Sequence, residues 1–200
     1  KIIKVKVTST SSEEVGEVLS EQTETVQKAD NTTIALAPEL ESKTENNIIL
    51  KLVLDYEYTK VNKDGSVAGA VWKDSSQFTR LAPNTEYDLY QRVKETDTHK
   101  ASDPNSKLTI KTKSELGGTV SITGTANYLE TLEANITSLT GNADISTLSY
   151  QWIRGAEDIL GAVSKTYTLT TADIGKIIKV KVTSTSSEEV GEVLSEQTET

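Results

Sequence analysis

The side chains able to do acid–base chemistry are sparse in this sequence. His99 is the only histidine, and Asp97 and Asp103 flank it. A histidine needs a positioned partner to act as a general base, and companion ligands to bind a metal. We expect a loop between two strands here, so His99 is interpreted as a solvated loop residue. No G-x-S-x-G motif brings serine and histidine together, and the sequence predicts no catalytic residue and no enzyme.

Acidic turns raise the question of calcium, which acidic extracellular domains often bind through oxygen ligands. The candidates are GNADIST (141–147), GAEDI (155–159) and NKDG (62–65). None has the dense D-x-D-x-D spacing of a calcium loop, so ordinary acidic turns are the preferred interpretation. We assign no metal and no cofactor.

Composition excludes several classes of protein. The net charge is −9, and residues 114–200 carry 12 acidic and 5 basic groups, which disfavours nucleic acid as a partner. No stretch approaches the roughly 20 apolar residues of a membrane-spanning helix. The absence of cysteine excludes disulfides and thiolate chemistry, and the absence of methionine suggests an internal piece or a processed product. Aromatic residues make up only 5% of the chain, so few side chains are available to stack on sugar rings in a carbohydrate site.

A perfect repeat links the two ends of the chain. Residues 1–25, KIIKVKVTSTSSEEVGEVLSEQTET, equal residues 176–200 at every position. In each copy, alternating apolar and polar residues predict a strand, SSEE a turn, and VGEVLSEQTET a second strand. A hairpin alone is marginally stable, so we expect the first copy to need a partner sheet that this chain does not supply. Its apolar residues are candidates for an inter-subunit or inter-repeat contact: Ile3, Val5, Val7, Val15 and Val18.

Between the copies, short runs with strand character recur at the spacing expected of β-sandwiches. In the middle region they are 47–54, 55–60, 67–73, 76–81, 85–95 and 106–112. In the last region they are 118–124, 129–139, 148–154 and 165–170, followed by the second hairpin. Asp64 and Gly65 predict a hairpin turn, and TTADIG (170–175) predicts one helical turn.

Two polar stretches, 26–33 and 113–118, are interpreted as connectors between domains. The predicted organisation is a partial hairpin at 1–25, a whole domain at 26–113 and a second whole domain at 114–200. Residues 1–25 are then the closing hairpin of a preceding repeat.

The stretch LAPNTEYDLYQRVKETDTHKAS (81–102) resembles fibronectin type III-like repeats of bacterial surface and secreted proteins. Leu81, Pro83, Thr85 and Tyr87 match the L-x-P-x-T-x-Y sequence that leads into strand F of that family. The resemblance implies that Tyr87 packs inward and anchors the preceding loop. It covers residues 34–113.

The stretches LSYQWIR (148–154) and KTYTLTTADIGKIIKVKVT (165–183) resemble bacterial Ig-like repeats. The resemblance places Trp152 in the core on strand C and makes residues 1–25 strands F and G of an identical domain. Ile177 stands where antibody-type domains have a corner tyrosine, which favours the bacterial branch. Trp72, in an alternating run with Val67 and Val71, is expected to be partly buried. The residues proposed as structural core are Leu81, Pro83, Tyr87, Trp152, Asp173, Gly175, Ile178, Val180 and Val182.

The sequence therefore predicts an all-β chain of tandem Ig-like sandwiches. The expected function is a non-catalytic repeat segment of an extracellular, cell-surface bacterial stalk, fibre or adhesin. Its expected partners are identical repeats or subunits joined head to tail, through covalent continuation or strand exchange at the duplicated hairpin.

Two alternatives remain open at this stage. In one, a loop such as KETDTHKASD (94–103) binds a host protein or glycan. In the other, the pair is an accessory region of a secreted polysaccharide-degrading enzyme. Glycosylation at Asn31 or Asn135 and an intramolecular Lys–Asn or Thr–Gln crosslink are further alternatives that stay open at this stage.

Overall fold

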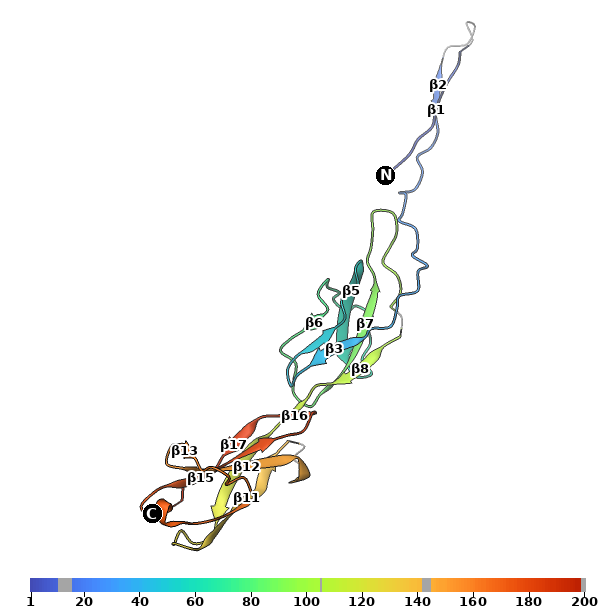
Figure 1. Cartoon of the computed structure of the whole chain (residues 1–200). Helices are drawn as coiled ribbons and strands as arrows, with labels where there is room; N and C mark the ends of the chain where they lie inside the picture. The colour runs from blue at the N-terminus through green and yellow to red at the C-terminus, as the bar shows by residue number, and fades with distance from the viewer. Residues whose placement is uncertain (11–15, 105, 142–144, 199–200) are drawn as a thin grey trace.

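The chain is elongated and built of β-strands. The computed structural model describes residues 1–10, 16–104, 106–141 and 145–198. Figure 1 shows a narrow hairpin at one end, a middle sandwich, and a final sandwich that contains the C-terminus. Within the described residues, no helix has the length and apolar character needed to cross a membrane.

The middle sandwich consists of two antiparallel sheets. One sheet has the order β3-β4-β6, with β3 at Leu40–Lys43, β4 at Ile48–Leu50 and β6 at Gln77–Phe78. The other has the order β5-β7-β8, with β5 at Tyr56–Asn62, β7 at Glu86–Val93 and β8 at Leu108–Lys111. Between the sheets lies a core of Ile48, Leu50, Tyr58, Phe78, Leu81, Tyr87 and Leu89.

Tyr87 ties the loop before β7 to this core. Its ring is buried, and its hydroxyl accepts a hydrogen bond of 3.0 Å from the backbone N–H of Ala82. The hydroxyl thereby holds the loop at a position five residues upstream of the tyrosine, in the manner of the tyrosine corner of Ig-like sandwiches.

The final sandwich also consists of two sheets. One has the order β10-β11-β14, with β10 at Gly117–Thr123, β11 at Thr131–Thr140 and β14 at Thr166–Thr168. The other has the order β13-β12-β15-β17, with β13 at Glu157–Asp158, β12 at Leu148–Arg154, β15 at Ile178–Ser184 and β17 at Glu192–Leu194. Two 3₁₀ turns, η1 at Ile145–Thr147 and η2 at Thr171–Asp173, complete it, and η2 is the helical turn that the sequence predicts.

Trp152 lies at the centre of the final core. Its side chain is fully buried, its ring centroid is 5.6 Å from that of Tyr167, and its indole N–H donates a 2.9 Å hydrogen bond to the Ser164 carbonyl. A buried indole needs such an acceptor for its polar N–H. Around it pack Val120, Leu132, Ala134, Leu169, Ile178, Val180 and Val182.

A short parallel pairing joins the two sandwiches end to end. β9 at Ser114–Glu115 pairs with β16 at Glu189–Val190, and the register is Ser114 with Glu189 and Glu115 with Val190. The connector between the sandwiches thus becomes part of the final domain's hydrogen-bonded structure.

Several predictions about these elements are wrong. Residues 67–73 form no strand, because Val67–Ala70 is a turn with Gly69 at a φ of +76°, and Val71 is 86% exposed. Residues 113–118 are not a plain connector, since they contain β9 and the start of β10. Pro83 and Gly175 are exposed rather than in the core. Gly175 instead supplies a turn with a φ of +71°, which glycine adopts without steric strain.

Candidate interface at the duplicated hairpin

Over the residues that the structure describes, 1–10 with 16–25 and 176–198, the two copies of the repeated sequence fold into hairpins of the same register. In the first copy, here called the leading hairpin (residues 1–25), β1 at Lys6–Thr8 pairs with β2 at Glu17–Leu19. In the second, here called the closing hairpin (residues 176–200), β15 pairs with β17. Val7 faces Val18 in one and Val182 faces Val193 in the other, so the register is identical.

Side-chain hydrogen bonds repeat as well. The Ser20 hydroxyl accepts from the Val5 N–H at 2.9 Å, and the Ser195 hydroxyl accepts from the Val180 N–H at the same distance. On the outer face, Lys6 lies 2.8 Å from Glu17, and Lys181 lies 3.9 Å from Glu192. The local sequence is therefore enough to define the hairpin, whatever lies beneath it.

Burial separates the two copies. Ile178, Val180 and Val182 are 2%, 0% and 0% exposed, whereas their counterparts Ile3, Val5 and Val7 are 54%, 59% and 63% exposed. Val18 is likewise 71% exposed, while its counterpart Val193 packs against the final core. Val15 lies outside the described residues. The leading hairpin thus presents to solvent the apolar face that the closing hairpin buries.

The closing hairpin docks on a surface that we call the acceptor body, residues 117–175 with the gap at 142–144. β15 pairs along the whole of β12, with Tyr150 opposite Val182, Trp152 opposite Val180, and Arg154 opposite Ile178. The buried face of β15 packs across the core against Val120, Leu132 and Ala134 of the other sheet. These contacts are what the exposed face of the leading hairpin lacks.

A charged cluster closes the outer end of the acceptor body. The carboxylate of Asp173 accepts hydrogen bonds from Arg154 Nε at 2.6 Å, the Tyr167 hydroxyl at 2.8 Å and the Thr170 N–H at 2.7 Å. Burial acts to raise the pKa of Asp173, but these donors outweigh it and hold the pKa below its ordinary value. Asp173, which the sequence placed in the core, is therefore a buried anchor of η2.

A second buried carboxylate lies in the middle sandwich, and sequence reasoning missed it. Asp88 on β7 is fully buried and accepts from Lys107 at 2.8 Å and from the Thr109 hydroxyl at 2.6 Å. Burial acts to raise its pKa, and these hydrogen bonds with that from the Asp64 N–H lower it below the ordinary value. In the sequence EYDLY nothing marks this position, because its partners come from distant strands.

The loop that contains His99 holds the leading hairpin's connector. Lys28 Nζ lies 2.5 Å from Glu95 and donates to the Thr96 carbonyl, and Ala29 forms a parallel bridge with His99. His99 is exposed, and its ring Nδ1 lies 2.9 Å from the Thr98 hydroxyl. The structure thus brings His99 together with neighbouring threonines and the connector.

The other chemistry-bearing candidates do not converge. Among the described residues, no group of three or more histidine and acidic side chains could hold a metal. The stretch 141–147 lies partly outside the described residues. Trp72 is half-buried, and the guanidinium carbon of Arg92 lies 4.2 Å from its ring centroid, so a cation–π contact covers that ring.

Comparisons with solved structures show likenesses to this chain. No family model and no curated protein matches the sequence. Among solved structures, a two-domain fibronectin type III segment from chicken tenascin is similar, with a TM-score of 0.33 and 15% sequence identity. The likeness covers 82% of this chain and 97% of that chain. The strands and cores described above define an all-β tandem of Ig-like sandwiches, the fold class that the sequence predicts.

Proposed function

We propose that this chain is a non-catalytic spacer, a segment of an extracellular bacterial stalk, fibre or adhesin in which two β-sandwiches are fixed end to end. The junction between the sandwiches carries this proposal. A spacer must transmit distance, and a bonded joint does so better than a flexible linker.

The joint is bonded on both sides of the connector. On the middle side, the Lys113 N–H donates to the Thr44 carbonyl at 3.0 Å. On the final side, the N–H groups of Ser114 and Leu116 donate to the carbonyls of Glu188 and Val190 at 2.9 and 2.8 Å. Consecutive connector residues thus hydrogen-bond to opposite sandwiches, which limits rotation about the joint.

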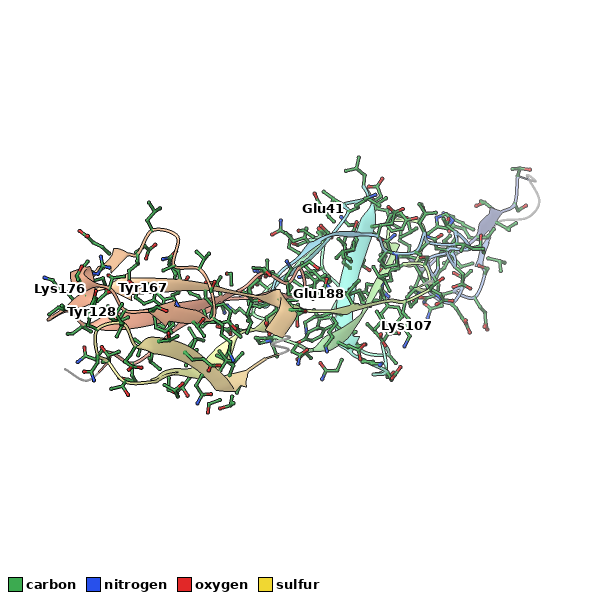
Figure 2. The ribbon with its side chains drawn as sticks, turned by 60° about the horizontal axis from the view of Figure 1, so that its bottom comes forward. Glu41, Lys107, Tyr128, Tyr167, Lys176 and Glu188 are labelled. Carbon is green, nitrogen blue, oxygen red and sulfur yellow. The ribbon has the colours of Figure 1, made fainter. Side chains whose placement is uncertain are left out.

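An ion pair spans the same joint. Lys43 Nζ, at the end of β3, lies 2.5 Å from Glu188 of the closing hairpin and also donates to the Lys111 carbonyl at 3.1 Å. Figure 2 shows Glu188 between the two sandwiches, and Tyr128 and Lys176 at the opposite end of the final one. The closing hairpin therefore runs the length of the final sandwich, from the joint to the outer end.

The bacterial and extracellular parts of the proposal are supported by the sequence resemblances at residues 81–102 and 148–183. Against the binding alternative, the 94–103 loop is occupied in part with holding residues 28–30.

Distance measurements between spin labels test the spacer. The chain has no cysteine, so Glu41→Cys and Lys176→Cys place labels on exposed positions of the middle and final sandwiches. We expect one narrow distance distribution, broadened by Lys43→Gln and unchanged by Lys51→Gln, which removes a surface ion pair to Glu39 within the middle sandwich. A broad distance distribution in the labelled chain that carries no substitution besides the two cysteines would overturn the spacer role. Saturable binding to a host protein or glycan would also overturn it.

A further inference from the structure

The leading hairpin is a preformed copy of a structural element that the final sandwich already accepts. Its register, its Ser20 and Thr23 hydrogen bonds and its outer-face ion pair match those of the closing hairpin. A methyl group at Gly191 would lie 3.2 Å from the Leu116 carbonyl oxygen, whereas one at Gly16 would meet no atom of the described chain within 4 Å. The two hairpins thus share one register and one set of local hydrogen bonds, and they differ in their surroundings.

We propose that the leading hairpin is an interaction surface for a second copy of this chain. It occupies the acceptor body of that copy in place of the closing hairpin, with Val5 opposite Trp152 and Val7 opposite Tyr150. This deepens the proposed function, on which it rests, because it makes the spacer a link that joins copies head to tail. The occupant is defined by sequence, because residues 1–25 have the same sequence as the closing hairpin, which β12 of the acceptor body already pairs with.

The geometry favours a neighbouring copy over the hairpin's own chain. The leading hairpin projects from the end of the middle sandwich that faces away from the final one (Figure 1). The Lys28–Glu95 ion pair, the Ala29–His99 bridge and the Lys100–Asp30 ion pair hold its connector at that end. The leading hairpin and the acceptor body therefore lie at opposite ends of the molecule. A contact between unlike ends of successive copies builds an open chain of molecules and not a closed dimer.

The polarity of the hairpins also fits a linear arrangement. In the final sandwich the turn of the closing hairpin lies at the joint with its own middle sandwich, and its open end, at Lys176 and Thr198, lies at the outer end. In the leading hairpin the open end adjoins the following middle sandwich, where the Val26 N–H donates to the Lys1 carbonyl at 3.2 Å. Exchange would therefore place the next middle sandwich just beyond the outer end.

Two surface cavities lie where that second joint would form. One, of about 350 Å³, is lined by Tyr128, Ile174, Lys176 and Ile178, and Tyr128 and Ile174 are 53% and 66% exposed. The other, of about 460 Å³, is lined by Lys1, Ile3, Val26 and Thr98. Lys1 and Ile3 are the copies of Lys176 and Ile178, so in the exchanged arrangement they take the places of those two residues. The cavity beside Val26 and Thr98 would then adjoin the cavity beside Tyr128 and Ile174.

A pair of matched substitutions in the full chain tests the exchange. Val180→Asp places a charge in the core and disables the closing hairpin, while Val5, its copy, remains intact. We expect this variant to form head-to-tail oligomers. Their mean size should increase as the protein concentration is raised by about a hundred-fold, since association follows mass action. Trp152 should stay buried in them, as read by its fluorescence in a Trp72→Phe background.

Two controls separate exchange from aggregation. The double variant Val5→Asp with Val180→Asp has no intact hairpin, so we expect it to lose both the ordered oligomers and the buried Trp152 signal. Val5→Asp alone should remain monomeric and folded. Val180→Asp that stays monomeric with Trp152 exposed at every concentration, or oligomers that persist in the double variant, would overturn the proposal.

A disulfide trap tests the register without disabling the core. Ser149 lies opposite Thr183 on β12 and β15, and the copy of Thr183 is Thr8. Full-length chains with Ser149→Cys and with Thr8→Cys should form a mixed disulfide dimer, whereas Ser149→Cys with Thr23→Cys should not. Equal yields from both pairs would contradict the register. A narrow spin-label distance without any exchange would leave the spacer standing and remove only this inference.

Discussion

Val180 lies directly opposite Trp152 across β15 and β12, and neither side chain is exposed to solvent. Val5 has the same sequence neighbours as Val180, yet 59% of it is exposed. One sequence in one chain thus occupies a core and a surface, and the difference measures what tertiary packing contributes.

Alanine at these two positions should have unequal effects. Val180→Ala leaves a cavity beside Trp152, and we expect it to lower the free energy of unfolding of the final sandwich by about 1–3 kcal/mol. Val5→Ala removes the same methyl groups from an exposed face and should change it by less than about 0.5 kcal/mol. Urea unfolding monitored by Trp152 fluorescence in the Trp72→Phe background measures both, and equal losses would contradict the burial difference.

Asp173→Asn should destabilise the final sandwich. It keeps the size of the side chain but removes the charge that receives the hydrogen bonds from Arg154, Tyr167 and Thr170. Leaving such partly buried donors poorly paired costs about 1–3 kcal/mol. Asp158→Asn, at an exposed position on β13, is the matched control and should leave the urea midpoint unchanged. A midpoint shift in the control as large as in Asp173→Asn would argue against the anchor.

Acid should weaken both sandwiches. The pKa values of Asp88 and Asp173 are lowered in the folded chain, so the unfolded chain binds more protons at low pH. Their contribution to stability is present above the unfolded value of about 3.9 and is lost as the pH falls through the lower folded values. Urea midpoints measured from neutral to strongly acidic pH should show this decline. It should be flatter in the double variant Asp88→Asn with Asp173→Asn, and an unchanged slope would refute the assignment.

Gly141→Ala should loosen the joint between the sandwiches. A Cβ at this position would clash with a Glu189 carboxylate oxygen and would lie 2.7 Å from the Glu115 carbonyl oxygen, at a φ of +112°. We expect the spin-label distance between positions 41 and 176 to broaden. Gly69→Ala, also at positive φ but with no atom within 4 Å in the described chain, controls for backbone strain alone and should leave that distance unchanged. Equal broadening of the distance distribution in the two variants would show that it comes from backbone strain and not from a steric clash at the joint.

How far the strands could be predicted depended on where their partners lie. LSYQWIR predicts a strand at 148–154, and β12 has those bounds, because its alternation follows from burying one face. β3, with the sequence LESK, was not predicted, since its residues carry little apolar signal and its pairing comes from β4. The parallel pairing of β9 with β16 was equally hidden, because it joins segments 75 residues apart.

The candidate interface divides in the same way. The apolar residues of the leading hairpin, Val15 aside, were identified from their alternation, and the structure places them on an exposed surface. The joint residues Lys43, Glu188 and Gly141 were missed, because an ion pair or a close approach between distant segments leaves no local pattern.

From its own residues the sequence determined the alternation, the turns and the duplication, all of which depend on neighbours within a few positions along the chain. It therefore determined that both copies form a hairpin, with one register and one set of local hydrogen bonds. Only the tertiary structure decided which copy is buried, because burial depends on a second sheet supplied by residues far away in the sequence. The same reason explains why the end-to-end joint and the buried Asp88 were found only in the three-dimensional structure.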